Sequence, residues 1–321
     1  MEDSPKILYF IASHKNPGQV LRLVETLKSG SPKSRVLIHH DYSKSYLNPA
    51  TLEHMSGVYV IEESLAVEWG DSSMTDMVLQ SFEWSKDSFI EFDWLVFLTG
   101  QDYPIRPLNQ LEDLLKRTRY DGFMGYGEAK EVWGGNLEED RYFFRYYKLP
   151  HFPYYYKLPS TLKKLLGRGR VAINKIQPLI RIKPFPRGLK TRFGVRRIST
   201  PFTPNYKCYG GSAWFTLSYE CVKYILQFVR ESPYILKHYQ RTLIPEESLF
   251  LTILLNNPAF KILNDDLHYI SWSPLAAHPD VLITEDFDRI VASKQFFARK
   301  FDINADSRIL DMLDEHIHKL S

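Results

Sequence analysis

Apolar residues occur along the chain in two patterns, short continuous runs and longer segments in which they recur at helical spacing. The short runs are rich in β-branched and aromatic residues, as strands are, and they cover 7–12, 35–41, 57–62 and 94–100. The helical segments cover 19–27 and 72–85. Because strands alternate with helices, this part of the chain predicts an α/β fold with a doubly wound sheet whose strands are largely parallel.

The second half of the chain has a less regular pattern. It predicts a strand that leads into a helix over 212–229, a helix over 248–257, a strand with its exit loop over 261–273, and a helix with an acidic start over 285–294. The sequence shows no internal repeat and no low-complexity linker. We therefore expect a single domain over 1–321.

Composition and cysteine usage narrow the class of protein. With 321 residues, 44% of them hydrophobic, the chain is long enough to bury a sizeable core. It begins with the polar sequence MEDSPK, and no apolar run is long enough to cross a bilayer, so we expect a cytoplasmic protein without a signal peptide or anchor. Cys208 and Cys221 form neither a CxxC nor a zinc pattern, which favours a reducing compartment.

Several common enzyme motifs are absent from the sequence. It contains no GxxxxGK[ST], no GxGxxG after the first strand, no HExxH and no GxSxG. The DxD formed by Asp286 and Asp288 lies at the start of a late predicted helix, so capping is favoured there over metal binding.

Polar residues follow the predicted strands, where doubly wound sheets bind their ligands. These residues are Ser13, His14, His40, Asp41, Gly100, Gln101 and Asp102. A tight turn alone would explain Gly100, but Asp102 at the end of a buried strand also fits a ligand site. Both interpretations stay open on spacing alone.

Two glutamates follow a proline in IPEESLFLTILLNNP (244–258). Pro245, Glu246 and Glu247 fit a helix N-terminus, because proline presets φ and the macrodipole favours acidic residues. The alternative is that one glutamate is a catalytic base. In FFARKFD (296–302), Arg299 and Lys300 are likewise either surface cations that pack on phenylalanine or cations that neutralise a diphosphate.

Taken together and in this order, several segments resemble the core-2/I-branching β-1,6-N-acetylglucosaminyltransferases and peptide O-xylosyltransferases, a glycosyltransferase family with a GT-A fold. The matching segments are ILYFIASHKNPGQVLRLVETL, IHHDYSKS, FDWLVFLTGQDYPIRP, GGSAWFTLSYECVKYIL, IPEESLFLTILLNNP, LHYISWS and FFARKFD. They extend over nearly the whole chain, from about residue 7 to residue 302. The resemblance implies a nucleotide-sugar-binding half over 7–110, a catalytic half over 111–302 with a basic insert at about 148–205, and a C-terminal helix over 303–321.

The resemblance also implies an inverting reaction with a UDP-sugar donor. Glu247 matches the second carboxylate of the family's Pro-acidic-Glu motif, which is the general base, and Glu246 is then a capping or supporting residue. Lys300 matches the lysine that binds the diphosphate, which implies that no divalent metal is needed. A family arginine that joins this lysine has no match here, so Arg299 and His278 are further diphosphate candidates.

The remaining implied roles concern the nucleotide and the sugars. The nucleotide candidates are Ser13, His14, His40 and Asp41. The donor and acceptor sugar candidates are Gln101, Asp102, Gly211, Ser212, Trp214, Glu139, Arg141 and Trp272, and Trp133 is a further stacking candidate. The expected donor is UDP-N-acetylglucosamine and the acceptor a glycan or glycoconjugate. The alternatives are UDP-xylose as donor, or a non-catalytic protein on the same fold that binds glycans or a membrane surface.

The formal net charge of +3 conceals a strongly basic segment. Residues 141–219 contain no Asp or Glu, while 161–197 interleave cations with apolar residues. A solvated face, a nucleic-acid patch and a membrane surface are the competing interpretations. No recognised nucleic-acid-binding fold accompanies the charge, so no nucleic acid is expected. The apolar residues and a lipid-linked acceptor favour peripheral contact with an anionic membrane through 157–197.

Overall fold

The computed structural model describes residues 4–149, 159–183, 191–273 and 278–320. A mixed seven-stranded sheet in the order β11-β6-β10-β4-β1-β2-β3 forms its centre. The strands are β1 (Ile7–Ser13), β2 (Arg35–His40), β3 (Val58–Val60), β4 (Trp94–Thr99), β6 (Gly122–Glu128), β10 (Tyr209–Ser218) and β11 (Ile262–Asn264). Strands β1 to β4 are parallel, whereas β10 is antiparallel to both β4 and β6. The predicted α/β class with a doubly wound, largely parallel sheet is confirmed, and β10 is the strand that makes the sheet mixed.

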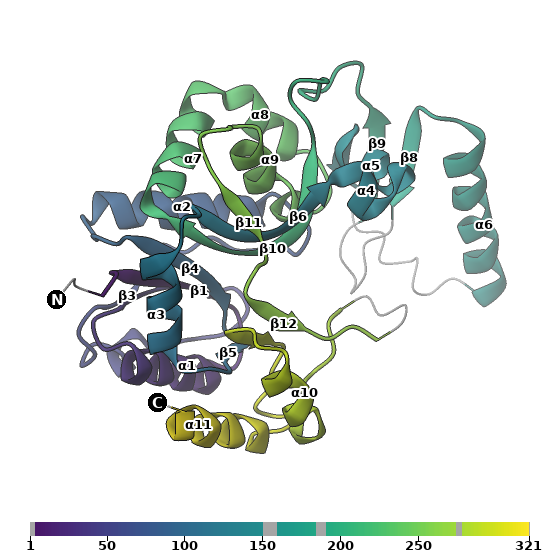
Figure 1. Ribbon diagram of the computed structural model, residues 1–321. Helices are drawn as coiled ribbons and strands as arrows, with labels where there is room; N and C mark the ends of the chain where they lie inside the picture. The colour runs from purple at the N-terminus through teal and green to yellow at the C-terminus, as the bar shows by residue number, and fades with distance from the viewer. Residues whose placement is uncertain (1–3, 150–158, 184–190, 274–277, 321) are drawn as a thin grey trace.

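Helices cover both faces of this sheet (Figure 1). One layer holds α1 (Pro17–Gly30), α3 (Leu108–Arg117) and α11 (Arg308–Leu320), and the other holds α2 (Ser73–Asp87), α7 (Tyr219–Glu231), α8 (Pro233–Tyr239) and α9 (Leu249–Leu255). In β1, Leu8 and Phe10 enter the core under α2 and α7, while Tyr9 and Ile11 enter the core under α1 and α3. Because both faces of β1 are buried, its sequence is a continuous apolar run.

A small second sheet corrects one sequence expectation. It consists of β12 (His268–Ile270), β13 (Phe297–Arg299) and β5 (Asp102–Pro104). Residues 261–273, expected as a strand with its exit loop, form two strands, β11 in the central sheet and β12 in the small one. The chain turns between them because Asp265 Oδ1 accepts a hydrogen bond from Leu267 N at 2.8 Å and Leu267 adopts a φ of 61°.

The two glutamates of IPEES do not begin the α-helix that follows them. Pro245–Glu247 forms a separate 3-10 turn after Ile244, whose φ is 52°, and α9 begins at Leu249. The expected helix over 248–257 is therefore confirmed, but the acidic pair lies outside it. The capping expectation for Asp286 is also confirmed, because Asp286 Oδ2 accepts a hydrogen bond from Ile283 N at 3.0 Å ahead of α10 (Phe287–Ala292).

The described part of the basic insert folds at the side of the central sheet. A third sheet pairs β7 (Phe144–Lys148), β9 (Arg192–Arg196) and β8 (Ile180–Lys183), and α6 (Ser160–Ile176) stands at the outer edge of the molecule (Figure 1). Short helices α4 (Ala129–Trp133) and α5 (Gly135–Tyr142) lead from β6 into β7. Residues 157–158 and 184–190 of the predicted membrane segment lie outside the described residues. No helix in the described ranges is long and apolar enough to pass through a bilayer.

Candidate active site

The ends of several central strands meet at one edge of the sheet. Because β1, β2 and β4 are parallel, their carboxyl ends lie side by side, with Ser13 opposite His40 and Ala12 opposite Thr99. Strand β10 runs in the opposite direction, so its first residues, from Tyr209 onward, lie at the same edge. Strand β6 ends there too and leads into α4. The topology therefore brings the nucleotide candidates Ser13 and His40 and the sugar candidate Gly211 to the edge where doubly wound sheets bind ligands.

The start of β10 holds the turn that carries Glu247. Ser248 Oγ donates a hydrogen bond to Tyr209 O at 2.5 Å, and Tyr209 N donates to Thr252 Oγ1 at 3.1 Å. Glu247 Oε2 accepts a hydrogen bond from Arg141 Nη1 at 2.7 Å, and the Glu247 side chain is 28% exposed. Burial raises the pKa of Glu247, although Arg141 opposes this shift. An oriented, accessible carboxylate with a raised pKa fits the requirements of a general base.

Arg141 is itself held in place by an aromatic ring. Its guanidinium carbon lies 4.1 Å from the ring centroid of Trp133, an arrangement typical of a cation–π contact. Trp133 packs in turn against Gly210 of β10, where a Cβ would collide with the indole. One face of Trp133, a predicted sugar-stacking residue, is thus occupied by Arg141. This stack fixes the direction from which Arg141 approaches Glu247.

Glu246 lies beside Glu247 but points into the protein. It is buried, and its Oε2 has no hydrogen-bond partner among the described residues. Burial and then the charge of Glu247 raise the pKa of Glu246 to about 8. Glu246 is therefore mostly protonated at neutral pH, so the two adjacent glutamates differ in charge as well as in exposure.

The predicted nucleotide residues lie at the ends of β1 and β2, where Ser13, His40 and Asp41 are buried and His14 is exposed. Ser13 Oγ lies 2.8 Å from His40 Nδ1, and Ser45 Oγ donates to His14 O at 3.0 Å. Burial lowers the pKa of His40, which keeps its imidazole neutral. Burial raises the pKa of Asp41, but hydrogen bonds to its carboxylate outweigh this effect and lower the pKa overall.

Asp41 uses both carboxylate oxygens within the protein. Its Oδ1 accepts hydrogen bonds from Ser43 N at 3.0 Å and Ser43 Oγ at 2.6 Å. Its Oδ2 accepts a hydrogen bond from Val67 N at 3.0 Å. The structure therefore shows Asp41 organising the loops that follow β2 and β3. Its contact with a nucleotide stays a prediction.

Asp102, which is fully buried, is the centre of a hydrogen-bonded cluster next to this site. Its Oδ2 accepts hydrogen bonds from Thr99 N at 2.6 Å and Trp214 Nε1 at 2.9 Å, and its Oδ1 accepts one from Arg299 Nε at 3.0 Å. The Arg299 guanidinium also stacks on Trp214, 3.8 Å from the ring centroid. His268 Nε2 lies 4.0 Å from Asp102. Asp102 thus joins β4, β10 and β13.

The predicted diphosphate residues Lys300 and His278 lie in neighbouring segments. Lys300 N donates a hydrogen bond to Asp280 O at 3.4 Å, two residues after His278. The His278 ring packs edge-on against Trp69, with ring centroids 6.0 Å apart. The residue after Trp69, Gly70, accepts a hydrogen bond from Ile244 N at 3.1 Å, just ahead of Glu247. The loop around Trp69 therefore connects the Lys300 region with the turn that carries Glu247.

Gly211 and Ser212 shape the start of β10. A Cβ on Gly211 would overlap the carbonyl oxygen of Gly125, so only glycine fits this crossing of β6 and β10. The pairing register shifts between Gly211 and Phe215, which marks a bulge. Ser212 Oγ accepts a hydrogen bond from Trp214 N at 3.2 Å. Both residues therefore set the path of the strand that carries Trp214.

Three further sugar candidates differ in their surroundings. Glu139 forms an ion pair with Arg196 at 3.1 Å. Gln101 Nε2 donates to Phe301 O at 3.3 Å. Trp272 is 57% exposed and offers an open ring.

In the described ranges, no three His, Cys, Asp or Glu side chains lie together as a metal-binding group.

The loop over residues 64–71 borders the site, although none of its residues was predicted to do so. Glu68 and Asp71 in this loop pair with Lys148 at 2.8 and 2.7 Å, and Glu68 also pairs with Arg192 at 2.8 Å. The segment VEWGDSS has a tryptophan and a glycine between two acidic residues, which is an unusual composition for a simple surface loop. This composition is the feature of the sequence from which the loop could have been predicted to border the site.

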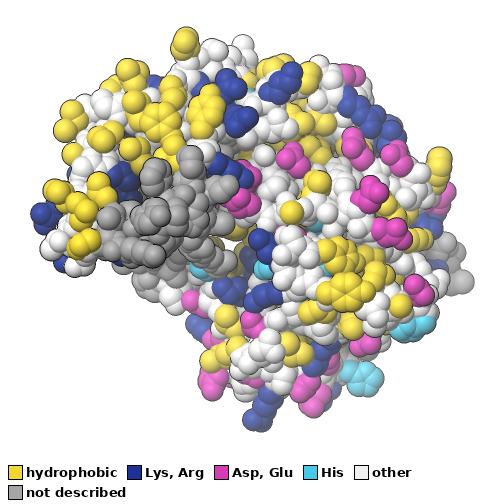
Figure 2. Space-filling model, turned by 180° about the vertical axis from the view of Figure 1, so that it is seen from behind, with side chains coloured by type: hydrophobic (Ala, Val, Ile, Leu, Met, Phe, Trp, Pro, Cys, Tyr) yellow, Lys and Arg dark blue, Asp and Glu magenta, His cyan; other side chains and the backbone are white. Residues whose placement is uncertain are grey.

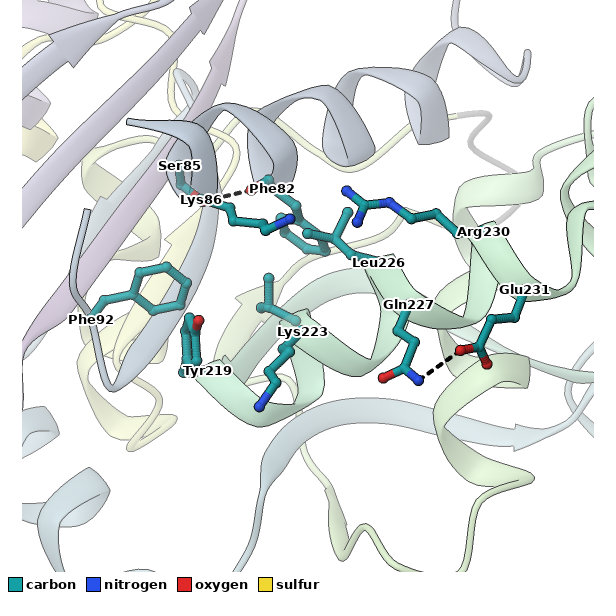
Figure 3. Close-up of a pocket in the computed structure, with 11 residues that line it drawn as sticks. Phe82, Ser85, Lys86, Phe92, Tyr219, Lys223, Leu226, Gln227, Arg230 and Glu231 are labelled. Atoms are coloured by element: carbon teal, nitrogen blue, oxygen red, sulfur yellow. Dashed lines mark hydrogen bonds between the residues drawn. The ribbon is translucent and has the colours of Figure 1, made fainter. Parts of the chain in front are cut away.

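The cavity shown in Figure 3 is not part of this site. It has a volume of about 430 Å³ and lies between α2 and α7, lined by Phe82, Phe92, Tyr219 and Leu226 among others. Phe82, Tyr219 and Leu226 come from these helices and Phe92 from the segment before β4, so the cavity lies away from the edge where the parallel strands end. The candidate active site is therefore defined by converging side chains and topology.

The fold and the site together define an α/β protein in which polar residues line the carboxyl ends of the parallel strands and an oriented carboxylate, Glu247, lies in a turn bonded to the start of β10. The profile of the Core-2/I-branching enzyme family matches residues 7–159 and 170–291. The chain belongs to this family, and the resemblance noted from its motifs is confirmed. The family match and the mixed α/β architecture agree with the expected GT-A-type fold.

Similar proteins carry more specific names. Xylosyltransferase oxt of Drosophila pseudoobscura pseudoobscura is 24% identical over 94% of this chain and 32% of its own length. Beta-glucuronosyltransferase GlcAT14A of Arabidopsis thaliana is 24% identical over 98% of this chain and 64% of its own length. The crystal structure of a glycosyltransferase involved in the glycosylation of the major capsid of PBCV-1 is 10% identical, with a TM-score of 0.34, over 98% of this chain and 99% of that one. The chain thus spans less than two thirds of the length of the xylosyltransferase and of the glucuronosyltransferase.

Proposed function

We propose that this protein is an inverting glycosyltransferase that moves a sugar from a UDP-sugar to a hydroxyl of a glycan or lipid-linked acceptor. The observation that carries the proposal is Glu247, an oriented carboxylate with a raised pKa at the ligand-binding edge of the sheet. The membership of the protein in the Core-2/I-branching enzyme family supports the same reaction class. The N-terminal half supplies the nucleotide pocket, and the Pro245–Glu247 turn before α9 supplies the base.

The proposed reaction is a single displacement. The acceptor oxygen attacks the anomeric carbon of the donor sugar while the bond to UDP breaks, and the bonding electron pair leaves with UDP. The acceptor proton passes to Glu247, whose Oε2 is held by Arg141, so we assign Oε1 as the proton acceptor. Lys300 stabilises the charge that develops on the diphosphate, so no divalent metal is required.

Arg299 acts in this scheme through its neighbours. Its guanidinium is stacked on Trp214 and bonded to Asp102, and it ends the strand that precedes Lys300. We propose that this arrangement forms the floor beneath the donor sugar and fixes where Lys300 begins. His278, packed on Trp69, is then the second residue next to the diphosphate.

The donor sugar distinguishes the detailed versions of this proposal. N-acetylglucosamine is the expected sugar, and xylose is the alternative, which the names of the similar xylosyltransferases support. Glucuronic acid is a third option, because a similar plant protein is named a glucuronosyltransferase. All three share the nucleotide, so the same pocket would hold each donor.

The test is UDP release from a panel of UDP-sugars in the presence of EDTA. We compare the parent with Glu247→Gln and Lys300→Ala, and use Glu220→Gln, an exposed carboxylate on α7, as a matched control. Activity should survive EDTA, favour one donor and fall by about 10²- to 10⁴-fold in Glu247→Gln. Activity that persists in Glu247→Gln would reject Glu247 as the base. A parent that binds glycans but releases no UDP with any donor would indicate the non-catalytic alternative.

A further inference from the structure

The helix α6 packs with its faces reversed relative to an ordinary surface helix. The partly buried positions are Lys163, Gly167, Arg170 and Asn174, which share one side at helical spacing. Asn174 pairs with β8 through two hydrogen bonds, donating to Ile182 O at 3.0 Å and accepting from Ile182 N at 2.9 Å. The polar side of α6 therefore faces the protein.

The apolar side of α6 faces away from the protein. It is formed by Leu162, Leu165, Leu166, Ile173 and Ile176, all exposed, with Leu165 at 64% and Ile176 at 83%. Surface helices of globular proteins normally turn such a stripe toward the core. Figure 2, seen from behind, shows hydrophobic side chains and cations side by side at the edge of the molecule that α6 occupies.

The charge on α6 complements an anionic surface. Lys164, Arg168 and Lys175 lie next to the apolar stripe on one side of the helix, and all three are exposed. The helix contains no acidic residue, and none occurs anywhere in residues 141–219. A second copy of the same face would bring like charges together. A nucleic acid would pair with the cations but leave the leucine and isoleucine side chains in water.

We infer that α6 is a peripheral membrane-binding helix that lies on an anionic phospholipid surface. Its apolar stripe enters the boundary between headgroups and acyl chains, while the flanking cations contact phosphate groups, as in other basic amphipathic helices. This inference extends the proposed function, since a lipid-linked acceptor would be presented at that surface. Binding itself requires neither a donor nor an acceptor.

Ion pairs and hydrogen bonds connect α6 to the candidate active site. Strand β8, which Asn174 joins to α6, is held by Asp140 through Arg181 at 2.7 Å and through Lys183. The next residue after Asp140 is Arg141, which bonds Glu247. A membrane-bound α6 would therefore hold the base at a fixed position relative to the lipid surface.

The experiment measures cosedimentation of the full-length chain with phosphatidylcholine vesicles and with vesicles of phosphatidylcholine mixed with phosphatidylglycerol. The first variant, Lys164→Glu with Arg168→Glu, reverses two positive charges, and the second, Leu165→Ser with Ile176→Ser, removes apolar contact. The control reverses two exposed cations on other helices, Lys223→Glu with Lys319→Glu. Circular dichroism and thermal unfolding confirm that each variant is folded.

We expect the parent to bind only the anionic vesicles and to be released by salt. Affinity should fall at least about fivefold for each cation removed, which corresponds to about 1 kcal/mol per cation at an anionic surface. The apolar pair should also weaken binding, whereas the control and Glu247→Gln should bind as the parent does. Vesicle binding by Glu247→Gln separates this inference from the proposed reaction.

Three results would overturn the inference. The first is equal binding of the parent to neutral and anionic vesicles, or to neither. The second is vesicle binding that depends on the cations but not on Leu165 and Ile176, which would indicate electrostatic attraction without entry of the apolar stripe into the lipid. The third is a dimer that dissociates in the Leu165→Ser and Ile176→Ser variant, which would assign the stripe to contact between copies.

Discussion

The substitution Glu246→Gln tests whether the glutamate beside the proposed base is buried as a neutral acid. In the folded protein the pKa of Glu246 is about 8, raised first by burial and then by Glu247, whereas the ordinary value is 4.5. The folded state therefore binds this proton more tightly than the unfolded state does. The corresponding stability is fully present below the unfolded pKa and is lost as the pH rises toward the folded pKa.

The size of the effect follows from the two pKa values. A tenfold difference in proton affinity is worth about 1.4 kcal/mol, so the interval from 4.5 to about 8 corresponds to about 5 kcal/mol. Most of it, about 3 to 4 kcal/mol, falls between about pH 5 and about pH 8. Glutamine has nearly the same shape and no charge in this range. Glu246→Gln should therefore match the parent near the lower pH and exceed its stability near the upper pH.

The assay is urea unfolding followed by tryptophan fluorescence at a series of pH values. The free energy of unfolding of Glu246→Gln minus that of the parent should rise with pH by the amount given above. Glu220→Gln, whose carboxylate is 65% exposed, is the control and should show no such trend. A constant difference between Glu246→Gln and the parent across the range would refute the buried neutral acid.

Three further predictions address the surroundings of the site. Asp102→Asn should destabilise the protein by about 3 to 5 kcal/mol in urea unfolding, because it leaves the Arg299 charge buried without its partner; adding Arg299→Met should restore part of this loss. Gly211→Ala should destabilise by at least about 1 to 3 kcal/mol through its clash with Gly125, whereas Gly18→Ala, at a position with open space around it, should be neutral or stabilising in the same assay. Arg141→Gln should raise the pKa of Glu247 further and move the acidic limb of the kcat/KM profile to higher pH; an unmoved limb would separate Arg141 from the base.

The central sheet could be predicted because its strands carry their own signal. In β1 and β4 both faces are buried, so each strand is an unbroken apolar run that needs no knowledge of its partners. The small sheets lack this property. Strand β5 pairs with β13, nearly two hundred residues away, and each has three residues, too few for a period to show. Strands β11 and β12 are equally short, which explains why 261–273 was expected to hold a single strand with its exit loop.

The residues of the candidate site were easier to predict than their contacts. The rule that ligands bind at strand ends placed Ser13, His40 and Asp102 near one another, as the structure does. It did not predict that Asp102 is wholly enclosed and bonded to Trp214 and Arg299. Those contacts depend on strand order and on the bulge in β10, which one sequence does not encode locally.

The pairing of Arg141 with Glu247 is another contact that could not be predicted from the sequence. The two residues are 106 positions apart in the chain, and each segment by itself is compatible with a simple helix end. Their contact arises because α5 and the turn before α9 are both brought to the amino end of β10. A residue can therefore be named as a base from its motif, while the group that orients it is found only in the folded protein.

The loop over 64–71 extends this argument to the whole site. Val67 N bonds to the end of β2 through Asp41, and Gly70 O receives the Ile244 N–H ahead of the base. The ion pairs of Glu68 hold the same loop to β7 and β9 of the basic insert. The predicted nucleotide edge, the proposed base and the insert that carries α6 thus share one connecting segment. Because ion pairs and hydrogen bonds join these parts through the loop, we expect a shift of the insert to be transmitted through it to Glu247.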